Sequence, residues 1–374
     1  MLRLCISNIS GAFADSAVLF PLLLTLALKS GFSFNTLLFT AGLTYFFSGW
    51  YFRVPISVQP LKSITLTAVV LGASSYEIRI SAAILGVICL LLLLFNRMLD
   101  LDRLARKIPV AVIHSLQFSL GILLIMQGIS YGKDQPFLIF QMLGAVAVLL
   151  FLTDRFKWPV LGWVALISLL SSLYSLPSKS SIVIIETSLE LLVRPFLILS
   201  LVLPQLALTL TNSVISTEAV TQKYFGEKAS RVTLQNLLKS IGTGNILSSL
   251  LGGMPFCHGA GGVTAHYWGG ARHWSSNLII GSTLVFLAGI GIFWGSFFLQ
   301  YPPFMLGVLL ISIGVFHLQL AELTFRSAAG KVKLMVSLAL TLAFKNLFVI
   351  LVIILGIEIC LAKVFRKQAR LRFE

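Results

Sequence analysis

Long apolar runs, repeated along almost the whole chain, are the feature that most limits how it can fold. A transmembrane helix needs about 20 apolar residues. Only 11% of the residues are charged, against about 25% in soluble domains, so lipid must surround most of the chain. We predict an all-α integral membrane protein, with full-length spans at 9–28, 35–52, 78–96, 108–130, 136–153, 158–176, 195–217, 235–251, 276–299 and 303–321. The run 334–361 is long enough for two shorter helices, interrupted by "FKN" at 344–346.

Two further apolar runs, 60–72 and 259–271, are only about half a span long. Each follows an irregular segment that contains proline: "VPISVQP" before the first and "GGMPFCHGAGG" at the start of the second. Counting them gives about 14 segments, and each half-length run is the third segment of its half. Seven segments per half imply two repeats of opposite membrane orientation. The expected units are a first repeat 1–176, an extracytoplasmic linker 177–194, a second repeat 195–362 and a basic cytoplasmic tail 363–374.

The positions of the basic residues support this topology. Of 28 Lys and Arg residues, 20 fall in loops on the side of the two termini and six in the opposite loops, while Lys62 and Lys239 lie in or beside spans. Loops rich in Lys and Arg are cytoplasmic. We therefore expect both termini in the cytoplasm and the chain in the cell (inner) membrane. The net charge of +15 is spread over short loops between apolar runs, which argues against a nucleic-acid partner.

The half-length runs predict a specific arrangement. The first helix is expected to begin at Pro60, because proline suits the first helical position, and the second after His258. Irregular backbone at this depth must be buried in protein or line a cavity, and the two extended segments could pair as short antiparallel strands. Two helix N-termini would then meet near the bilayer centre and offer free N–H groups to an anion. Proline kinks in ordinary helices would not explain the matched positions and lengths.

The candidate ligand groups lie at these two breaks. At the first they are Gln59, Pro60, Leu61 and Lys62, and Lys62 either neutralises the anion or lies behind it. At the second break the backbone N–H groups of 258–261 are the best donors, and the candidates there are Cys257, His258, Gly259, Ala260 and Gly261. His258 is either a ligand that titrates or a structural histidine bonded to a carbonyl. Cys257 is expected to be a small packed residue.

The same segments resemble a known family. "VPISVQPLKSI" is similar to a motif of the molybdate transporters of plants, algae and bacteria, and "GGMPFCHGAGGVTAHYWGGAR" resembles their second motif. The chain departs from the family pattern at Ile56 and Ser57 and at His266 and Trp268. That family is filed as a relative of the SulP sulfate permeases, which share a fold of seven plus seven inverted segments with the uracil/xanthine permeases. The resemblance implies this fold and oxyanion transport.

In the related permeases, segments one and eight flank the half-helices, so polar residues in these segments become candidates. Asp15 is the only carboxylate well inside an early span, and an intramembrane acid is a functional candidate by default. It either carries the proton of a symport cycle or anchors the second half-helix by a hydrogen bond. In segment eight, helical spacing places Gln205, Thr209 and Asn212 roughly on one face.

These observations predict a secondary active transporter, not an enzyme, for a tetrahedral dianion such as molybdate or sulfate. Proton-coupled symport by alternating access is expected, because the chain has no P-loop for ATP. An anion exchanger or channel of the same fold remains an alternative. An intramembrane thiol enzyme using Cys257 and His258 is disfavoured, because adjacent residues of an extended segment point to opposite faces. The sequence predicts no cofactor and no metal site, and leaves the oligomeric state open, with a homodimer as one option.

Overall fold

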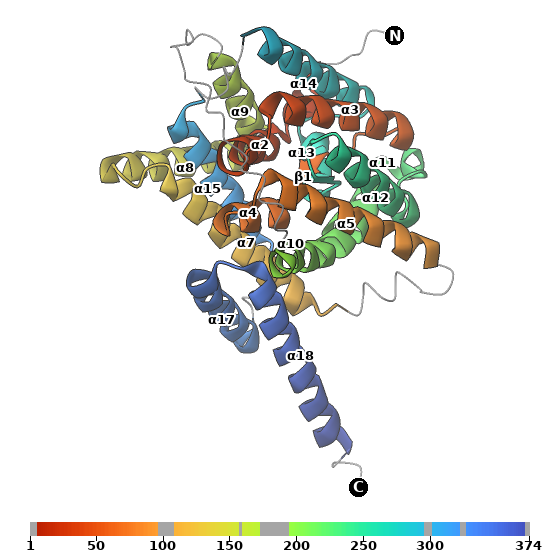
Figure 1. Cartoon of the computed structure of the whole chain (residues 1–374), viewed down its shortest axis with the longest axis vertical. Helices are drawn as coiled ribbons and strands as arrows, with labels where there is room; N and C mark the ends of the chain where they lie inside the picture. Colours follow the sequence, from red (N-terminus) through yellow and green to blue (C-terminus); the bar gives the residue numbers. More distant parts are fainter. Residues whose placement is uncertain are drawn as a thin grey trace.

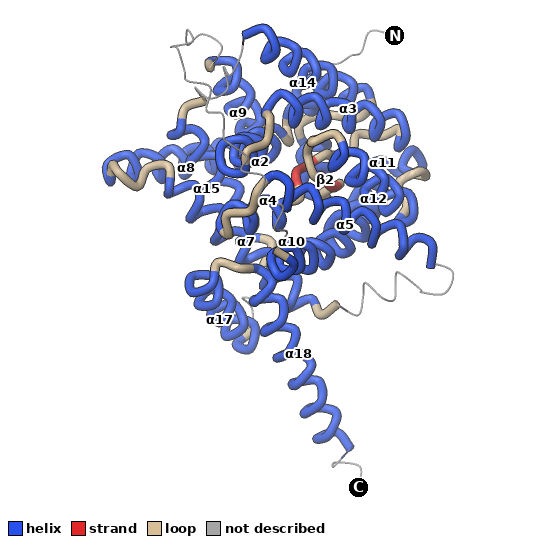
Figure 2. Tube along the Cα trace, viewed as in Figure 1, coloured by secondary structure: helices blue, strands red, loops and turns tan. Residues whose placement is uncertain are grey.

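The computed structural model describes residues 6–95, 108–156, 159–172, 194–294, 301–321 and 327–370. Within these ranges the chain is helical, apart from one pair of two-residue strands at the centre of the helices (Figures 1 and 2). The predicted linker, up to residue 193, lies outside the described residues. The first-half helices are α1 (Ile6–Phe13), α2 (Ser16–Ser30), α3 (Phe34–Phe52), α4 (Lys62–Val70), α5 (Ser75–Leu94), α7 (Val110–Ser130), α8 (Pro136–Phe156) and α9 (Val160–Ser171).

The second half begins with one long helical stretch of changing geometry. It consists of α10 (Pro195–Leu208), a π-helical part η2 (Thr209–Ser216), α11 (Thr217–Phe225) and a 3₁₀ turn η3 (Gly226–Ala229). The remaining helices are α12 (Leu234–Leu250), α13 (Ala260–Trp268), α14 (Ser275–Trp294), α15 (Pro303–Gln319), α17 (Ala328–Phe344) and α18 (Leu347–Arg370). The two strands are β1 (Gln59–Pro60) and β2 (Phe256–Cys257).

The chain is a multi-pass membrane protein. Six helical stretches of the described residues are long and apolar enough to cross a bilayer: Ile6–Ser30, Ser75–Leu94, Val110–Ser130, Pro136–Arg155, Pro195–Ala229 and Ser275–Ile292. Three shorter helices, Val160–Ser171, Pro303–Gln319 and Leu347–Leu361, are also apolar. Each of these nine stretches overlaps a run predicted from the sequence to be a span.

The first predicted span is not one continuous helix. α1 ends at Phe13 and α2 begins at Ser16, with Asp15 at the N-cap position of α2. The Asp15 carbonyl accepts the first bonds of α2, from Val18 N at 3.0 Å and from Leu19 N at 3.2 Å. Residues 14–15 contain no proline or glycine that would signal this break. Its effect is to bring the Asp15 side chain to an interruption of the helix.

Three helix crossings depend on glycine. A Cβ on Gly42 of α3 would lie 2.8 Å from the carbonyl oxygen of Gly281 on α14, and one on Gly86 of α5 would lie 2.7 Å from that of Gly242 on α12. The helices α7 and α15 cross in the same way at two glycine pairs, Gly121 with Gly314 and Gly128 with Gly307. Small residues allow this close approach of helix backbones inside a bilayer. Each crossing joins a helix of the first half of the chain to a helix of the second half.

The expected antiparallel pairing of the two extended segments is confirmed. Gln59 lies opposite Cys257 and Pro60 opposite Phe256, and Leu61 N donates to Pro255 O at 3.0 Å. The segments lie about 200 positions apart in the sequence, yet each supplies the hydrogen-bond partner of the other. This pairing satisfies backbone groups that would be costly to leave unpaired in a buried, water-poor interior.

The helices that follow the strands are shorter than predicted. α4 begins at Lys62, not at Pro60, because Pro60 is still paired in β1. α4 ends before Gly72, which has φ +63°, and α13 ends before Gly270, which has φ +104°. Each helix therefore has nine residues and a length of about 14 Å, where the sequence predicted 13 residues. The prediction was wrong because it took the apolar residues at both ends as helical.

Two asparagines hold the extended segments in place. Asn277 of α14 bonds to both backbone groups of Ile56, accepting from N at 3.1 Å and donating to O at 2.7 Å. Asn245 of α12 does the same for Phe256, at 2.9 Å and 2.7 Å. Each carboxamide substitutes for a neighbouring strand, since it offers one acceptor and one donor with the correct spacing.

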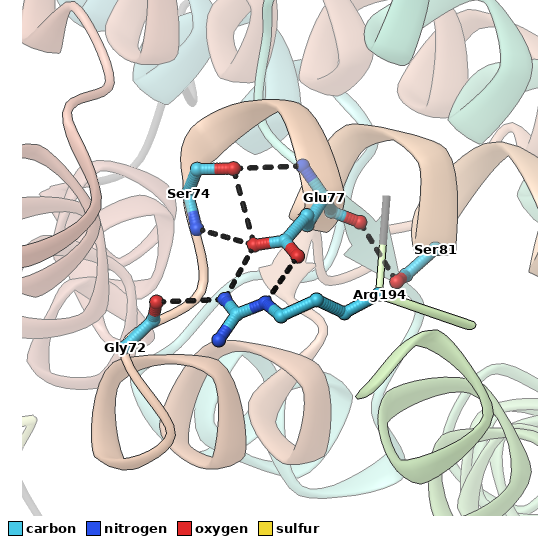
Figure 3. Close-up of polar contacts among 5 residues, drawn as sticks. All are labelled: Gly72, Ser74, Glu77, Ser81 and Arg194. Carbon is cyan, nitrogen blue, oxygen red and sulfur yellow. Dashed lines mark hydrogen bonds and ion pairs between the residues drawn. The ribbon is translucent and has the colours of Figure 1, made fainter. Parts of the chain in front are cut away.

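Beyond the C-terminal end of α4, Arg194 links the two halves of the chain (Figure 3). Its Nε donates to Glu77 Oε1 and its Nη2 to Glu77 Oε2, both at 2.7 Å, and Nη2 also donates to Gly72 O at 3.0 Å. Glu77 in turn caps the start of α5 together with Ser74. The fork-shaped guanidinium thus joins the start of α10 to the α4–α5 turn.

Replacing Arg194 by Lys should destabilise this junction, because an ammonium cannot make the two parallel bonds to a carboxylate. Arg194 is half exposed, so solvent screening limits the expected loss to about 1 kcal/mol. The measurement is thermal unfolding in detergent of Arg194→Lys, Glu77→Gln and the double variant. We expect the double variant to lose less than the sum of the two single losses. Additive losses would show that the pair contributes nothing.

The C-terminal apolar run forms two helices, as predicted. α17 ends at Phe344, where Lys345 adopts φ +51°, and α18 begins at Leu347. Lys333 of α17 forms an ion pair with Glu358 of α18. The α18 helix continues to Arg370 and extends beyond the other helices (Figure 1). The predicted tail, which starts at residue 363, therefore begins inside this helix.

Candidate functional site

The first turn of α13 has one packed side and one open side. A Cβ on Gly259 would lie 2.4 Å from Gln59 Oε1, and one on Gly262 would lie 2.7 Å from Asp15 Oδ2. On the other side, a Cβ on Gly261 would meet no atom within 4 Å, and Gly261 itself is exposed. Residues 259 and 262 share a side because they lie three positions apart in a helix. The glycines thus let this helix end approach polar side chains while its open side stays accessible.

Free backbone donors are present at this helix end. Gly262 N and Val263 N already donate to Gly259 O, at 3.0 Å and 3.2 Å. Among the described residues, the N–H groups of Ala260 and Gly261 have no backbone or side-chain acceptor. Uncapped N–H groups and the helix dipole give this end the chemistry of an anion site. Of the two predicted donors, Gly261 is exposed on the open side, and Ala260 is buried next to it.

Asp15 and Gln59 form a buried pair beside the α13 N-terminus. Gln59 Nε2 donates to Asp15 Oδ1 at 2.5 Å. The remaining oxygens, Asp15 Oδ2 and Gln59 Oε1, are buried and have no hydrogen-bond partner among the described residues. Both face glycines of the first turn of α13. Asp15 therefore bonds to the first extended segment and contacts the second half-length helix.

The N-terminus of α4 differs from that of α13, because a side chain already caps it. Gln205 Oε1 of α10 accepts from Ser63 N at 3.0 Å and from Ile64 N at 3.4 Å. Gln205 Nε2 donates to Thr209 Oγ1 at 3.2 Å. Gln205 and Thr209, both predicted to face the substrate, thus act together at the end of α4.

The other candidates at the first break differ in their surroundings. Pro60 and Leu61 are buried, Pro60 in the strand and Leu61 at the N-cap position of α4. Lys62 is partly exposed, and its ammonium has no ion-pair partner in the described part of the chain. Its charge acts on the nearby Asp15 carboxylate. A cation placed in this way can neutralise an anion that binds between the helix ends.

His258 is held on both ring nitrogens. Its Nδ1 bonds to Ser57 O at 2.7 Å and its Nε2 to Ser240 Oγ at 2.9 Å. The ring is buried and packs edge-on against Phe52 and Phe256. Of the two roles left open by the sequence, this geometry matches the structural histidine. Its side chain ties β2 to the first extended segment.

Cys257 is buried and packs in the hydrophobic core, as expected of a small packed residue. Since both nitrogens of His258 are bonded elsewhere, the imidazole cannot act as a base for this thiol. The structure therefore gives no support to a thiol enzyme.

Asn212 lies near the second helix end, with its Nδ2 3.9 Å from the place of a Cβ on Gly259. It belongs to the π-helical part η2. Thr217, at the start of α11, donates its Oγ1 hydrogen to Asn212 O at 3.0 Å and to His258 O at 2.6 Å. A π-helix has wider turns than an α-helix, so the three predicted polar residues do not serve one location. Gln205 and Thr209 serve α4, while Asn212 lies beside α13.

Several residues of the site were not among the predicted ligands. Asn245, Asn277, Thr217 and Ser240 position the extended segments, and Gly262 makes the close contact with Asp15. Asparagines inside the apolar stretches "GTGNIL" and "SSNLII" were the available sequence signal, because a buried carboxamide requires partners.

Comparisons with known proteins identify the family of this chain. A family profile described as molybdate transporter of the MFS superfamily matches residues 7–124 and 197–316. The chain belongs to this molybdate transporter family. Among curated relatives of this family member, Molybdate transporter 2 of Arabidopsis thaliana is 26% identical over 365 residues, covering 83% of the chain and 77% of the relative. Molybdate transporter 1 of Chlamydomonas reinhardtii is 33% identical over 125 residues, covering 33% and 24%.

Solved structures show the fold that this family member shares with other transporters. The transmembrane domain of the cyanobacterial bicarbonate transporter BicA has a TM-score of 0.63 at 18% identity, covering 94% of this chain and 97% of that one. The murine anion transporter Slc26a9, in an inward-facing state, has a TM-score of 0.60 at 15% identity, covering 95% and 69%. The expected likeness to the sulfate permease group is thereby confirmed. The chain is a transporter of the anion-transporter fold, not an enzyme.

Proposed function

We propose that the protein is a secondary active transporter of a tetrahedral oxyanion, molybdate or sulfate. The observation that carries this proposal is the α13 N-terminus, where the N–H groups of Ala260 and Gly261 have no acceptor among the described residues and Gly261 borders open space. The Asp15–Gln59 pair packs against the same turn. Backbone donors bind the oxygens of a dianion without a buried arginine. Membership of the molybdate transporter family supports molybdate as one of the two substrates. Both anions have the same shape and charge, so amide donors alone discriminate little between them.

We also propose that the chain is built from two inverted repeats, 1–176 and 195–362. The glycine crossings support this symmetry. Gly307 and Gly314 of α15 lie 186 positions after Gly121 and Gly128 of α7, respectively. In the structure Gly121 contacts Gly314 and Gly128 contacts Gly307, as expected when the two helices are related by a two-fold axis. Gly42 of α3 contacts Gly281 of α14, and Gly242 of α12 contacts Gly86 of α5. These glycines correspond with offsets of 200 positions (Gly42 to Gly242) and 195 positions (Gly86 to Gly281). Inverted repeats of this kind alternate access by moving one bundle against another around a midplane site.

The proposed orientation places both termini in the cytoplasm of a cell with the protein in its inner membrane. The 20 to six division of basic residues between the two sides supports it. The α13 N-terminus would then lie near the bilayer centre, and α4 and α13 would run from it toward opposite faces.

Uptake into proteoliposomes tests the proposed function. Labelled molybdate should enter saturably and faster than into protein-free vesicles, and unlabelled sulfate should compete. An inward proton gradient should drive accumulation above equilibrium, which neither a channel nor a simple exchanger would show. If neither anion enters or competes, the proposal is wrong.

Replacing Asp15 by Asn tests the proposed coupling. A negative carboxylate beside the bound dianion repels it, so protonation of Asp15 should favour binding, and external acid should increase uptake by the wild type. Asn imitates the neutral acid and retains the acceptor for Gln59 Nε2. We expect Asp15→Asn to bind the anion but to lose concentrative uptake and its acceleration by acid. Asp134→Asn, the same substitution at an exposed turn between α7 and α8, is the matched control. Normal proton-driven accumulation in Asp15→Asn would exclude Asp15 as the coupling group.

A further inference from the structure

The two helix ends at the proposed site are unequal, and Gln205 causes the difference. Its Oε1 takes the N–H groups of Ser63 and Ile64 at the start of α4, at 3.0 Å and 3.4 Å. These are the groups that an oxyanion would otherwise use, since the first N–H groups of a helix have no partner inside it. A third donor of this end, Leu61 N, bonds to Pro255 O.

The orientation of the Gln205 carboxamide follows from its contacts. Nε2 donates to Thr209 Oγ1 at 3.2 Å, and a hydroxyl can accept this bond. The reversed orientation would place the NH₂ group against two N–H donors. Gln205 is buried, 2% exposed, so few alternative positions are open to the side chain. The cap is therefore held at both its oxygen and its nitrogen.

At the start of α13, no side chain of the described residues makes a corresponding bond. The nearby amide of Asn212 presents Nδ2, a donor, toward Gly259. A donor cannot cap the N–H groups of Ala260 and Gly261, but it can contribute to an oxyanion site. The buried oxygens Gln59 Oε1 and Asp15 Oδ2 lack partners here and face the same turn.

We propose that Gln205 is a positioning residue that occupies the N–H groups of Ser63 and Ile64, so that the oxyanion takes its hydrogen bonds mainly from the α13 end. This inference rests on the proposed oxyanion transport and assigns unequal roles to the two helices. A carboxamide is neutral, so it satisfies two N–H groups of α4 without cancelling the helix dipole. α4 then attracts the anion through its dipole and through Lys62, and α13 supplies the hydrogen bonds.

Charge at position 205 is the critical property. In Gln205→Glu, the carboxylate can still accept from Ser63 N and Ile64 N, and a negative cap is favourable at a helix N-terminus. Its capping bonds offset part of the cost of burying a carboxylate, so the variant should fold, and thermal unfolding checks this. Its molybdate affinity should fall on the order of 100-fold in the pH range where this carboxylate is ionised, because the added negative charge repels the dianion. Gln135→Glu adds the same charge at an exposed turn between α7 and α8 and should keep wild-type affinity.

The experiment combines equilibrium binding of labelled molybdate to purified wild type, Gln205→Glu and Gln135→Glu with a cryo-electron microscopy structure of the wild type in molybdate. The heavy metal atom marks the anion. We expect it beside Ala260 N and Gly261 N, with Gln205 still bonded to α4. Wild-type affinity in a folded Gln205→Glu, or an anion on Ser63 N and Ile64 N with Gln205 displaced, would overturn the inference but leave oxyanion transport intact. If the wild type binds neither molybdate nor sulfate, the proposed function fails and the inference fails with it.

Discussion

Replacing Gly262 by Ala should reduce molybdate uptake to the level of protein-free vesicles. The added Cβ would lie 2.5 Å from Ser57 Cβ, 2.6 Å from Gln59 Nε2 and 2.7 Å from Asp15 Oδ2. Real Cβ atoms do not approach other atoms this closely, and protein interiors have little room to adjust. Since the contacted atoms are buried, α13 must move away from the Asp15–Gln59 pair. The geometry of both the anion donors and the coupling acid would be lost.

Gly289→Ala is the matched control for this substitution. Gly289 lies in α14, and a Cβ there would meet no atom within 4 Å. Both variants should be purified and reconstituted in equal amounts, with elution profile and thermal unfolding as tests of folding. We expect normal uptake by Gly289→Ala. Normal uptake by a folded Gly262→Ala would mean that contact between α13 and Asp15 is not needed for transport.

The sequence was sufficient for the central feature of the fold. Gln59 and Pro60 stand inside an apolar stretch, and so do Phe256 and Cys257, at matched positions in the two halves. Buried backbone without a helix must find partners, so pairing of the two segments could be predicted, and the structure confirms it. The candidate ligands at the start of α13 followed from the same pattern.

Side-chain partners could not be predicted in the same way. Gln205 lies on the same segment as Thr209 and Asn212, and helical periodicity gave all three the same role. The periodicity of one helix does not reveal which neighbouring helix each residue contacts, and the π-helical turn after Thr209 alters the spacing. The position of the α4 N-terminus beside Gln205 is a tertiary feature. For the same reason, the sequence could not decide between a ligand and a structural role for His258.

Helix boundaries were the other source of error. The break at Asp15 has no proline or glycine at residues 14–15, and the start of α4 at Lys62 depends on strand pairing with a segment far along the chain. Local sequence preferences predict neither the break at Asp15 nor the strand pairing that delays the start of α4. Where a break did follow from local signals, as at Lys345 between α17 and α18, the prediction was correct.

Gly261→Asp should abolish anion binding without disturbing the fold. Gly261 is exposed, and a side chain there enters open space. An acidic residue in the first turn of a helix interacts favourably with its free N–H groups and dipole, so thermal stability should be unchanged or higher. The tethered carboxylate would occupy the place of the dianion and repel it. Gly261→Asn has nearly the same shape without the charge, so it should retain much more affinity.

Equilibrium binding of labelled molybdate to purified wild type, Gly261→Asp and Gly261→Asn tests most directly whether the α13 N-terminus is the anion site. The wild type should bind one molybdate per chain, and sulfate should compete. Gly261→Asp should show an affinity at least about 100-fold lower, since a negative charge would lie within a few ångströms of the dianion, with Gly261→Asn between the two. Wild-type molybdate binding by a folded Gly261→Asp would place the anion elsewhere and contradict the account.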